Sequence, residues 1–325
     1  MALAVLRRLM QMAFVMLGIS VIVFLIFFAT PGADPAARIA GRAASPEVLA
    51  AVRHDFGFDQ PLYVQYGLMM KRLFVTGDLT SFVNRGYKVL PAIVDAVPAT
   101  MSLVAGTAVL WVLLGIVIGT VAAMTHNRWP DRILMMLGLV GISMPVFWVG
   151  SVVNLVTQGP WHDTWLFSWV PALGYVPLTQ DPIGWAKALV LPWITMALLF
   201  IGIYGRVLRA SLLEAYQEDF IRTARAKGLT ETRILLWHAL RTSLVTFVSL
   251  FGLDFGFLVG GGTLPTEVVF NIHGVGKLTV DALQNLDLPF VMATVMYGAF
   301  FVVASNAVVD IAYAALDPRV RLGRA

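Results

Sequence analysis

The chain has 325 residues, of which 58% are hydrophobic and only 13% are charged. Soluble domains carry about 25% charged residues, so this composition excludes an ordinary soluble fold, and a mean hydropathy of +0.80 predicts a protein of the lipid bilayer. There are no cysteines, which excludes disulfides, thiolate metal sites and cysteine nucleophiles. The net charge of +4 is interpreted as Lys and Arg held on the cytoplasmic side, not as a nucleic-acid surface.

Six apolar segments are long enough to cross a hydrocarbon core of about 30 Å. They are residues 9–29, 100–123, 133–157, 186–205, 244–264 and 289–313. The first is predicted to be an uncleaved span, because its apolar run is longer than the roughly 7–15 residues of a signal-peptide core. The predicted fold class is therefore an all-α integral membrane protein with six transmembrane helices. Its predicted parts are an N-terminal transmembrane helix (1–30), an extracytoplasmic segment with short helices (31–99) and a core of five spans (100–325).

The distribution of charge predicts the orientation. If both termini are cytoplasmic, the inner segments hold 14 basic and 6 acidic residues, and the outer segments hold 9 basic and 11 acidic residues. Lys and Arg accumulate in short cytoplasmic loops. We therefore predict a multi-pass protein with both termini inside and with residues 31–99 and 158–185 outside.

The two outer segments carry their own structural signals. Ser45 followed by Pro46 predicts the start of a helix. Residues 61–76 predict a further helix, whose apolar face packs on the outer mouth of the bundle or lies in the membrane interface. Three tryptophans in the second outer segment predict interfacial anchors: Trp161, Trp165 and Trp169.

Residues 206–243 form the longest predicted cytoplasmic loop and hold seven basic residues. Asp219 is expected to be an N-cap, and residues 220–227 to form a short helix about 12 Å long. Gly228 is expected to end that helix, because glycine adopts a positive φ without strain.

A short rigid helix between two spans can transmit a displacement from a cytoplasmic partner to both of them. Ala224 and Ala226 favour this interpretation, since small side chains allow close seating in another protein. The alternative interpretation is a basic loop that contacts anionic lipid.

The run DFIRTARAKGLTETRILLWHALRTSL resembles the EAA loop of binding-protein-dependent ABC importers, specifically the oligopeptide/dipeptide/nickel permease family. Other motifs agree in order and spacing over residues 1–323, among them FGFDQPLYVQY, VPATMSL, SMPVFW, LPWITMAL and TEVVFNIHGVGKL. The chain is most similar to the first permease subunit of the pair. The resemblance implies the ABC importer permease fold in the bacterial inner membrane. It also implies three kinds of partner: a second homologous permease subunit, two ATP-binding subunits and an extracytoplasmic substrate-binding protein.

The resemblance places coupling to the ATPase on eight residues of the inner loop: Asp219, Arg222, Thr223, Ala224, Arg225, Ala226, Lys227 and Gly228. The conserved EAA–G positions of the family fall on Arg222, Thr223, Ala224 and Gly228, so that Arg stands at the glutamate position. There are two departures from the family pattern. Thr246 stands where relatives often have proline, and the usual PGDP is spaced out to PGADP over residues 31–35.

No ATP site is predicted in this chain. A phosphate-binding loop needs G-x-x-x-x-G-K-[ST], and the nearest approach, at Gly276 and Lys277, has Asn271 and Leu278 at the other two defining positions. We therefore expect no cofactor and no enzymatic activity in this chain, with ATP and Mg bound by partner subunits. The five histidines are scattered and predict no metal site.

Asp254, near the middle of the fifth span, is a costly carboxylate that should face the bundle interior or a water-filled path. Two interpretations stay open: it lines the translocation pathway and meets a peptide amine or other cation, or it is an interior hydrogen-bond acceptor that holds two spans together. Glu267 and Asn271 follow at the external end, where the resemblance places the outer gate. All three are candidate pathway residues.

The predicted function is import of di- or oligopeptides by alternating access, driven by partner ATPases. Within the family, the alternative cargo is nickel, another chelated metal or another small solute. From a different class, a stand-alone channel or secondary transporter would require inverted repeats and broken helices, and the sequence predicts neither.

Overall fold

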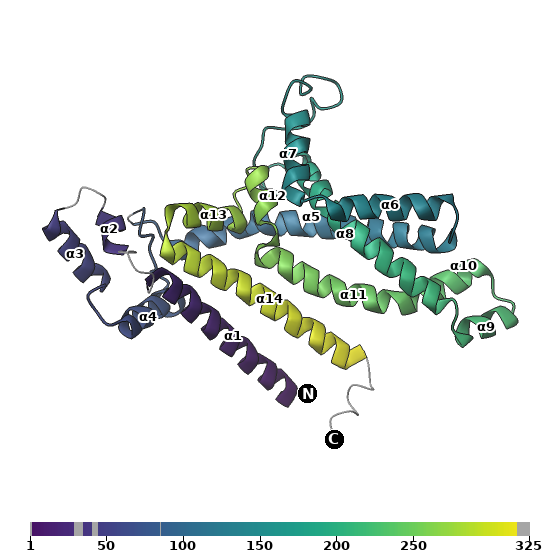
Figure 1. Cartoon of the computed structure of the whole chain (residues 1–325), viewed down its shortest axis with the longest axis horizontal. Coiled ribbons are helices and arrows are strands. Elements are labelled where there is room, and N and C mark those ends of the chain that lie inside the picture. The colour runs from purple at the N-terminus through teal and green to yellow at the C-terminus, as the bar shows by residue number, and fades with distance from the viewer. Residues whose placement is uncertain (1, 29–34, 41–44, 85, 317–325) are drawn as a thin grey trace.

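The computed structural model describes residues 2–28, 35–40, 45–84 and 86–316, and these ranges are built from helices and loops (Figure 1). The α-helices in chain order are α1 (Ala2–Phe28), α2 (Pro35–Ala40), α3 (Pro46–Phe56), α4 (Leu62–Lys71), α5 (Val89–Met124), α6 (Trp129–Ser143), α7 (Val146–Thr157), α8 (Pro182–Ala215), α9 (Asp219–Ala226), α10 (Glu231–Ile234), α11 (Leu240–Phe257), α12 (Leu264–Val269), α13 (Val275–Asn285) and α14 (Leu288–Leu316). Three π-helical turns continue α4 and flank α11, at Arg72–Thr76, Leu235–Ala239 and Leu258–Gly262. The predicted all-α fold is confirmed.

Five helical segments of the described chain are long and apolar enough to cross a membrane. They are Leu6–Ile26, Val89–Met124, Pro182–Ala215, Glu231–Gly262 and Leu288–Val309. These correspond to five of the six predicted spans, and several continue well beyond the predicted ends.

The third predicted span is divided into two helices, α6 and α7, that meet at 96°. The expectation of one continuous helix over residues 133–157 is therefore wrong, as is the expectation that no span is broken. The cause is local, because Pro145 has no N–H and disfavours helical geometry in the residue before it. Met144 accordingly has extended backbone angles, with φ −98° and ψ 127°.

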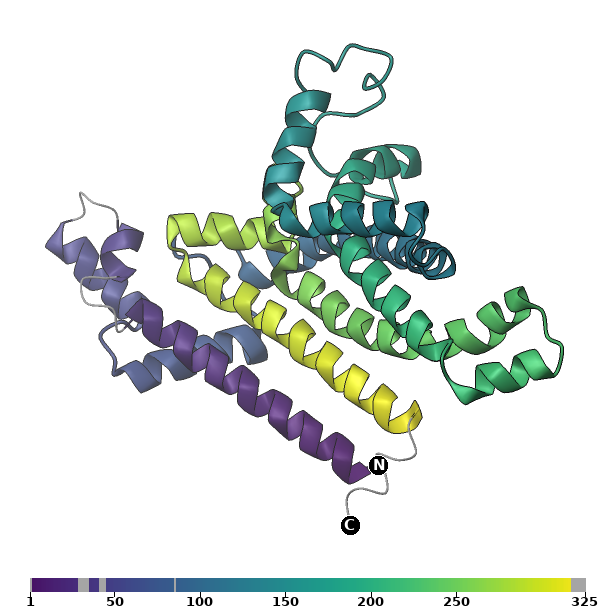
Figure 2. The same ribbon diagram turned by 45° about the vertical axis from the view of Figure 1, so that its right-hand side comes forward.

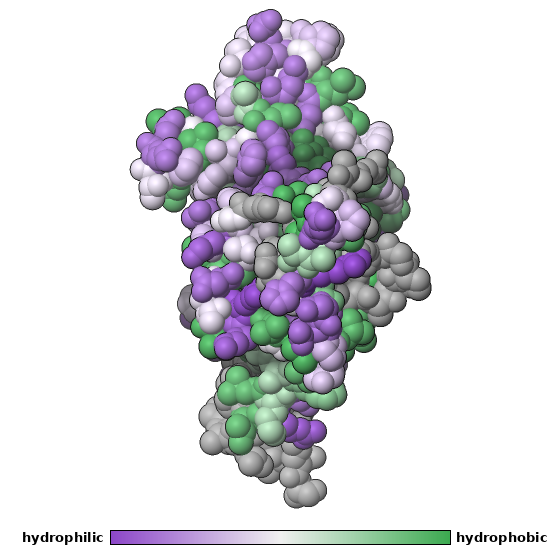
Figure 3. Space-filling view, turned by 90° about the vertical axis from the view of Figure 1, so that its left-hand side faces the viewer, coloured by the Kyte–Doolittle hydropathy of each residue, from purple (hydrophilic) through white to green (hydrophobic). Residues whose placement is uncertain are grey.

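The helices form an elongated bundle (Figures 1 and 2). Helices α9 and α10 lie at one end, called here the α9 end, and α13 lies toward the opposite end, called the α13 end. Helices α1 and α14 run side by side, with the start of α1 and the last turns of α14 directed toward the α9 end. Helix α7 points away from the bundle, across the direction of α5 and α8. Many hydrophilic residues cover the face seen from the α13 end (Figure 3).

The centre of the bundle is the packed pair α5 and α8. Trp111 of α5 stacks on Phe200 of α8 with ring centroids 4.5 Å apart, and Tyr204 lies beside the same indole ring. Aromatic pairs of this kind contribute about 0.5–1.5 kcal/mol beyond the area that they bury. Helices α6 and α8 approach backbone to backbone at Gly138 and Gly202. A Cβ atom at Gly202 would lie only 2.4 Å from the Gly138 carbonyl oxygen, so this approach requires glycine.

The segment between the first two spans packs against α1 through α4. The Tyr66 hydroxyl lies 2.7 Å from the Ser20 hydroxyl of α1, and the Tyr66 ring meets Phe24 edge to face. Met69 and Leu73 of the same face are buried. The predicted helix is therefore present, and α1 is the surface that receives its apolar face.

Helix α3 begins as predicted. Ser45 is its N-cap and accepts a hydrogen bond from the Val48 N–H at 3.4 Å, with Pro46 as the first helical residue. The PGADP departure falls largely on residues 31–34, which lie outside the described residues.

Candidate functional site

Helix α9 contains most of the residues predicted to couple to an ATPase. It spans Asp219–Ala226, one residue earlier than predicted, and Glu218 instead of Asp219 occupies the N-cap position. The Asp219 carboxylate accepts a hydrogen bond from Arg222 at 3.3 Å on the helix surface. Gly228 has φ +76°, so the predicted left-handed end of the helix is confirmed.

Helix α9 has one buried face and one exposed face. Ile221 and Ala224 are 0% and 5% exposed, and both belong to the main apolar core of the chain. Ala224 therefore packs on its own subunit, which differs from the predicted contact with another protein. Ala226 is exposed. Six other predicted coupling residues share this exposure: Asp219, Arg222, Thr223, Arg225, Lys227 and Gly228.

An ion pair fixes α9 against α10. Arg225 donates from Nε and Nη2 to the Glu231 carboxylate, at 2.7 and 3.2 Å. The Arg225 guanidinium also lies 5.7 Å from the centre of the Tyr216 ring. Burial raises the pKa of the Tyr216 phenol and Glu231 adds to that rise, so the ring stays neutral and meets Arg225 as a cation–π contact. Exposed pairs contribute little stability, and these contacts link Arg225 of α9 to α10 and to Tyr216 at the end of α8.

A second charged cluster joins α6 to α8 near the α9 end. The Asp131 carboxylate is almost fully buried and accepts two hydrogen bonds from Arg209, from Nε at 2.6 Å and from Nη2 at 2.7 Å. The Asn127 N–H donates to the same carboxylate at 2.9 Å, from a residue with φ +62°. No sequence motif identifies this pair, because its members are 78 residues apart and on different helices.

Asp254 has an interior partner. Its carboxylate accepts a hydrogen bond of 2.6 Å from the hydroxyl of Tyr204, which is fully buried in α8. Trp111 and Phe247 pack against the Tyr204 ring. The bond joins α8 to α11, which is what the interior-acceptor interpretation requires.

Glu267 is enclosed at the junction of three helices. It is fully buried, and its Oε1 accepts hydrogen bonds of 2.8 Å from the hydroxyls of Thr100 and Thr263. Its Oε2 accepts from the Lys277 N–H at 2.9 Å, and Thr100 in turn accepts from the Val275 N–H at 2.9 Å. Helix α13 has no capping side chain at its own N-cap, Gly274. Glu267 and Thr100 therefore satisfy its first-turn N–H groups and tie α5, α12 and α13 together.

Asn271 is exposed, has φ +54° and accepts a hydrogen bond from the Lys277 ammonium group. The three pathway candidates thus have separate surroundings: Asp254 is bonded to α8, Glu267 is enclosed, and Asn271 is at the surface. They do not form a single site in this conformation. Their assignment to the pathway stays a prediction.

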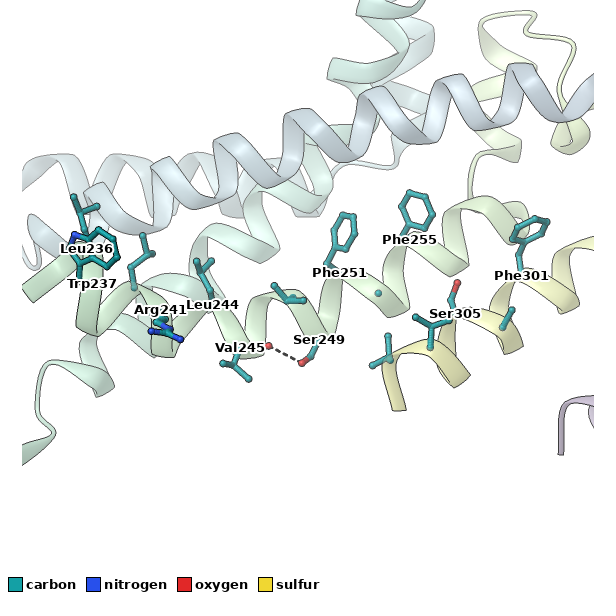
Figure 4. Close-up of a pocket in the computed structure, with 16 residues that line it drawn as sticks. Leu236, Trp237, Arg241, Leu244, Val245, Ser249, Phe251, Phe255, Phe301 and Ser305 are labelled. Atoms are coloured by element: carbon teal, nitrogen blue, oxygen red, sulfur yellow. Dashed lines mark hydrogen bonds between the residues drawn. The ribbon is translucent and has the colours of Figure 1, made fainter. Parts of the chain in front are cut away.

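An apolar groove of about 930 Å³ runs between α11 and α14 (Figure 4). Trp237 and Phe255 of the α11 segment and Phe301 of α14 line it, and Asp254 does not. Its polar edge consists of Arg241 and two serines. Across the described ranges, no group of three or more His, Asp or Glu side chains is placed to hold a metal ion.

Apolar helices of membrane-spanning length, joined near one end by a short helix with one polar face, define an α-helical multi-pass membrane protein. The family model described as "Binding-protein-dependent transport system inner membrane component" matches residues 115–322, and the N-terminal model of the same transport systems matches residues 1–104. The chain belongs to this family of transport permeases. The resemblance seen in its motifs is confirmed.

Individual relatives are similar over almost the whole length. A Brucella abortus (strain 2308) protein, named as a peptide transport system permease protein, is 38% identical over 320 residues, covering 98% of each chain. The glutathione transport system permease protein GsiC of Salmonella typhi is 37% identical over 319 residues, again covering 98% of each chain. The sequence similarity therefore extends over the residues of α6, α7, α9 and α12.

Proposed function

We propose that the chain is one permease subunit of an ABC importer that moves peptides into the cytoplasm by alternating access. The observation that carries the proposal is α9, a short helix with one face packed on its own subunit and the other face exposed. It follows α8 directly and leads through α10 into the fifth span. Peptide cargo is supported by the names of the relatives, which refer to peptides and to glutathione.

In this proposal, the α9 end is cytoplasmic, both termini are inside, and the chain lies in the bacterial inner membrane. Two ATP-binding subunits bind and hydrolyse ATP and contact the exposed face of α9. A second homologous permease and an extracytoplasmic binding protein complete the importer. This chain carries out no reaction of its own.

The packing gives a physical route for coupling. Displacing α9 must move α8 and the α10–α11 segment, because Ile221 and Ala224 are embedded in the core that these helices share and a close-packed interior resists compression. The Arg209–Asp131 pair then carries the movement of α8 to α6. The spans thereby shift together between inward-facing and outward-facing arrangements.

Reconstitution of the assembled importer tests the proposed function. In proteoliposomes that contain all subunits, uptake of a labelled dipeptide or tripeptide should require both ATP and the binding protein. The purified chain alone should neither hydrolyse ATP nor carry peptide. ATP-independent peptide uptake by the single chain would contradict the proposal and would support a stand-alone transporter.

Thiol labelling tests the orientation in a chain that has no native cysteine. Cysteines introduced at Thr76 and Asp163, both exposed, should react with an impermeant reagent added to intact cells. A cysteine at Thr232, which is exposed in α10, should react only after the membrane is opened. Labelling of the Thr232→Cys variant from outside would reverse the proposed orientation.

A further inference from the structure

The break between α6 and α7 lies within the depth of the bilayer. Helix α6 has 15 residues and is therefore about 22 Å long at 1.5 Å per residue, which is shorter than a hydrocarbon core of about 30 Å. Helix α7 turns away by 96° and so adds little length along the bundle. The non-helical backbone at residues 144 and 145 is consequently surrounded by hydrocarbon wherever it faces lipid.

The residues at the break are exposed in the chain. Ser143, Met144 and Pro145 all lie at the surface. Pro145 offers no N–H and the chain leaves the axis of α6 at Met144, so the last carbonyl groups of α6 lack their usual helical donors. Lipid cannot supply donors, and irregular backbone at membrane depth occurs only where protein covers it or water reaches it. The surface at the break is therefore not a lipid-facing surface.

A second interrupted span meets the first along α7, beyond the break. The fifth span ends in the π-helical turn Leu258–Gly262, where exposed Gly261 has φ +136°, and α12 follows. Helix α12 then packs on α7, where the Asn154 side-chain amide donates to the Val269 carbonyl at 2.8 Å. A Cβ atom at Gly150 of α7 would lie 3.1 Å from the Phe270 ring, which shows how closely the two pieces approach. The segments that follow the two breaks thus pack against each other.

We propose that the exposed surface at the α6–α7 break, formed by Met144, Phe147, Trp148 and Ser151, lines the water-filled translocation pathway of the assembled importer. Phe147 and Trp148 are 54% and 50% exposed beside the open backbone. Water in the pathway satisfies the carbonyl groups of α6, and the aromatic and thioether side chains contact apolar parts of the transported solute. This inference rests on the proposed transport function. The competing arrangement is permanent burial of the same surface against the second permease subunit.

Cysteine accessibility in the complete importer tests the proposal. Phe147→Cys and Ser151→Cys are compared with Leu113→Cys, a control on the uninterrupted helix α5 where the native side chain is 57% exposed. The probe is a charged, membrane-impermeant methanethiosulfonate applied to inside-out vesicles and to right-side-out vesicles, with and without ATP and vanadate. At least one orientation and nucleotide state should label residues 147 and 151 ten or more times faster than residue 113. Labelling should also block peptide uptake.

If residues 147 and 151 react no faster than residue 113 in every state, the pathway assignment is wrong and the surface is closed by lipid or by the second permease. Peptide uptake by the native importer, which carries no cysteine, is measured first and depends only on the proposed function. Absence of uptake by the native importer therefore overturns that function, whereas slow labelling of both cysteine variants with normal native uptake overturns only the pathway assignment.

Discussion

Replacement of Glu267 by alanine is expected to destabilise the permease by about 3 kcal/mol or more. The change removes an acceptor from two buried hydroxyls and from first-turn N–H groups of α13, and each buried donor left without a partner costs roughly 1–3 kcal/mol. The contacts that join α5, α12 and α13 disappear together. The expected result is a markedly lower melting temperature of the detergent-solubilised complex, read by fluorescence-detected gel filtration after heating.

Glu267→Gln is the matched control, because it keeps the shape and one acceptor oxygen. The amide oxygen can face the N–H of Lys277, and the Thr100 and Thr263 hydroxyls can rotate to accept from the amide nitrogen. We expect this variant to retain most of the native melting temperature. Equal stability of the alanine variant and the native chain would show that Glu267 does not hold the three helices together.

The second large effect is expected in α9, where alanine is replaced by glutamate on the buried face or on the exposed face of the same helix. Ala224→Glu places a carboxylate in the apolar core, and an unpaired buried charge costs about 3–5 kcal/mol. Ala226→Glu adds the same group to the exposed face, where water solvates it. Hydrogen exchange of the α9 amides should be about 100-fold faster in the Ala224 variant, as a change of about 3 kcal/mol in local opening requires. The Ala226 variant should stay within a few fold of the native rate, and equal exchange in both variants would contradict the assignment of faces.

The sequence predicted the spans because each is a long apolar run, and that signal does not depend on partners. It also predicted the end of α9, since Gly228 needs only a positive φ, which is a local property. The helix start at Ser45 and Pro46 was predicted for the same reason. At Gly228 and at Ser45–Pro46, where local chemistry decides the conformation, the prediction and the structure agree.

The features that the sequence did not reveal depend on contacts between distant residues. The Asp131–Arg209 pair and the Thr100–Glu267 bond join residues 78 and 167 positions apart. Which face of α9 is buried depends on packing against α8 and α10, so Ala224 and Ala226 could not be distinguished in advance. The break at Pro145 is different, because proline and the residue before it carry a local signal. The apolar run through residues 133–157 has the length of a normal span, so it was predicted to be one continuous helix despite that signal.

In the proposed importer, the exposed face of α9 transmits the energy of ATP hydrolysis to the spans. The most direct measurement is the number of peptides imported per ATP hydrolysed by reconstituted importers that carry Ala226→Glu, with Ala226→Ser as the control. We expect the Ala226→Glu complex to keep a native melting temperature and native peptide binding by the separate receptor. Its import per ATP should nevertheless fall at least tenfold, and Ala226→Ser should behave as the native chain does. Normal import and normally coupled hydrolysis in the Ala226→Glu complex, together with normal coupling after charge reversal at Arg222, would show that this face of α9 is not where the ATPase acts.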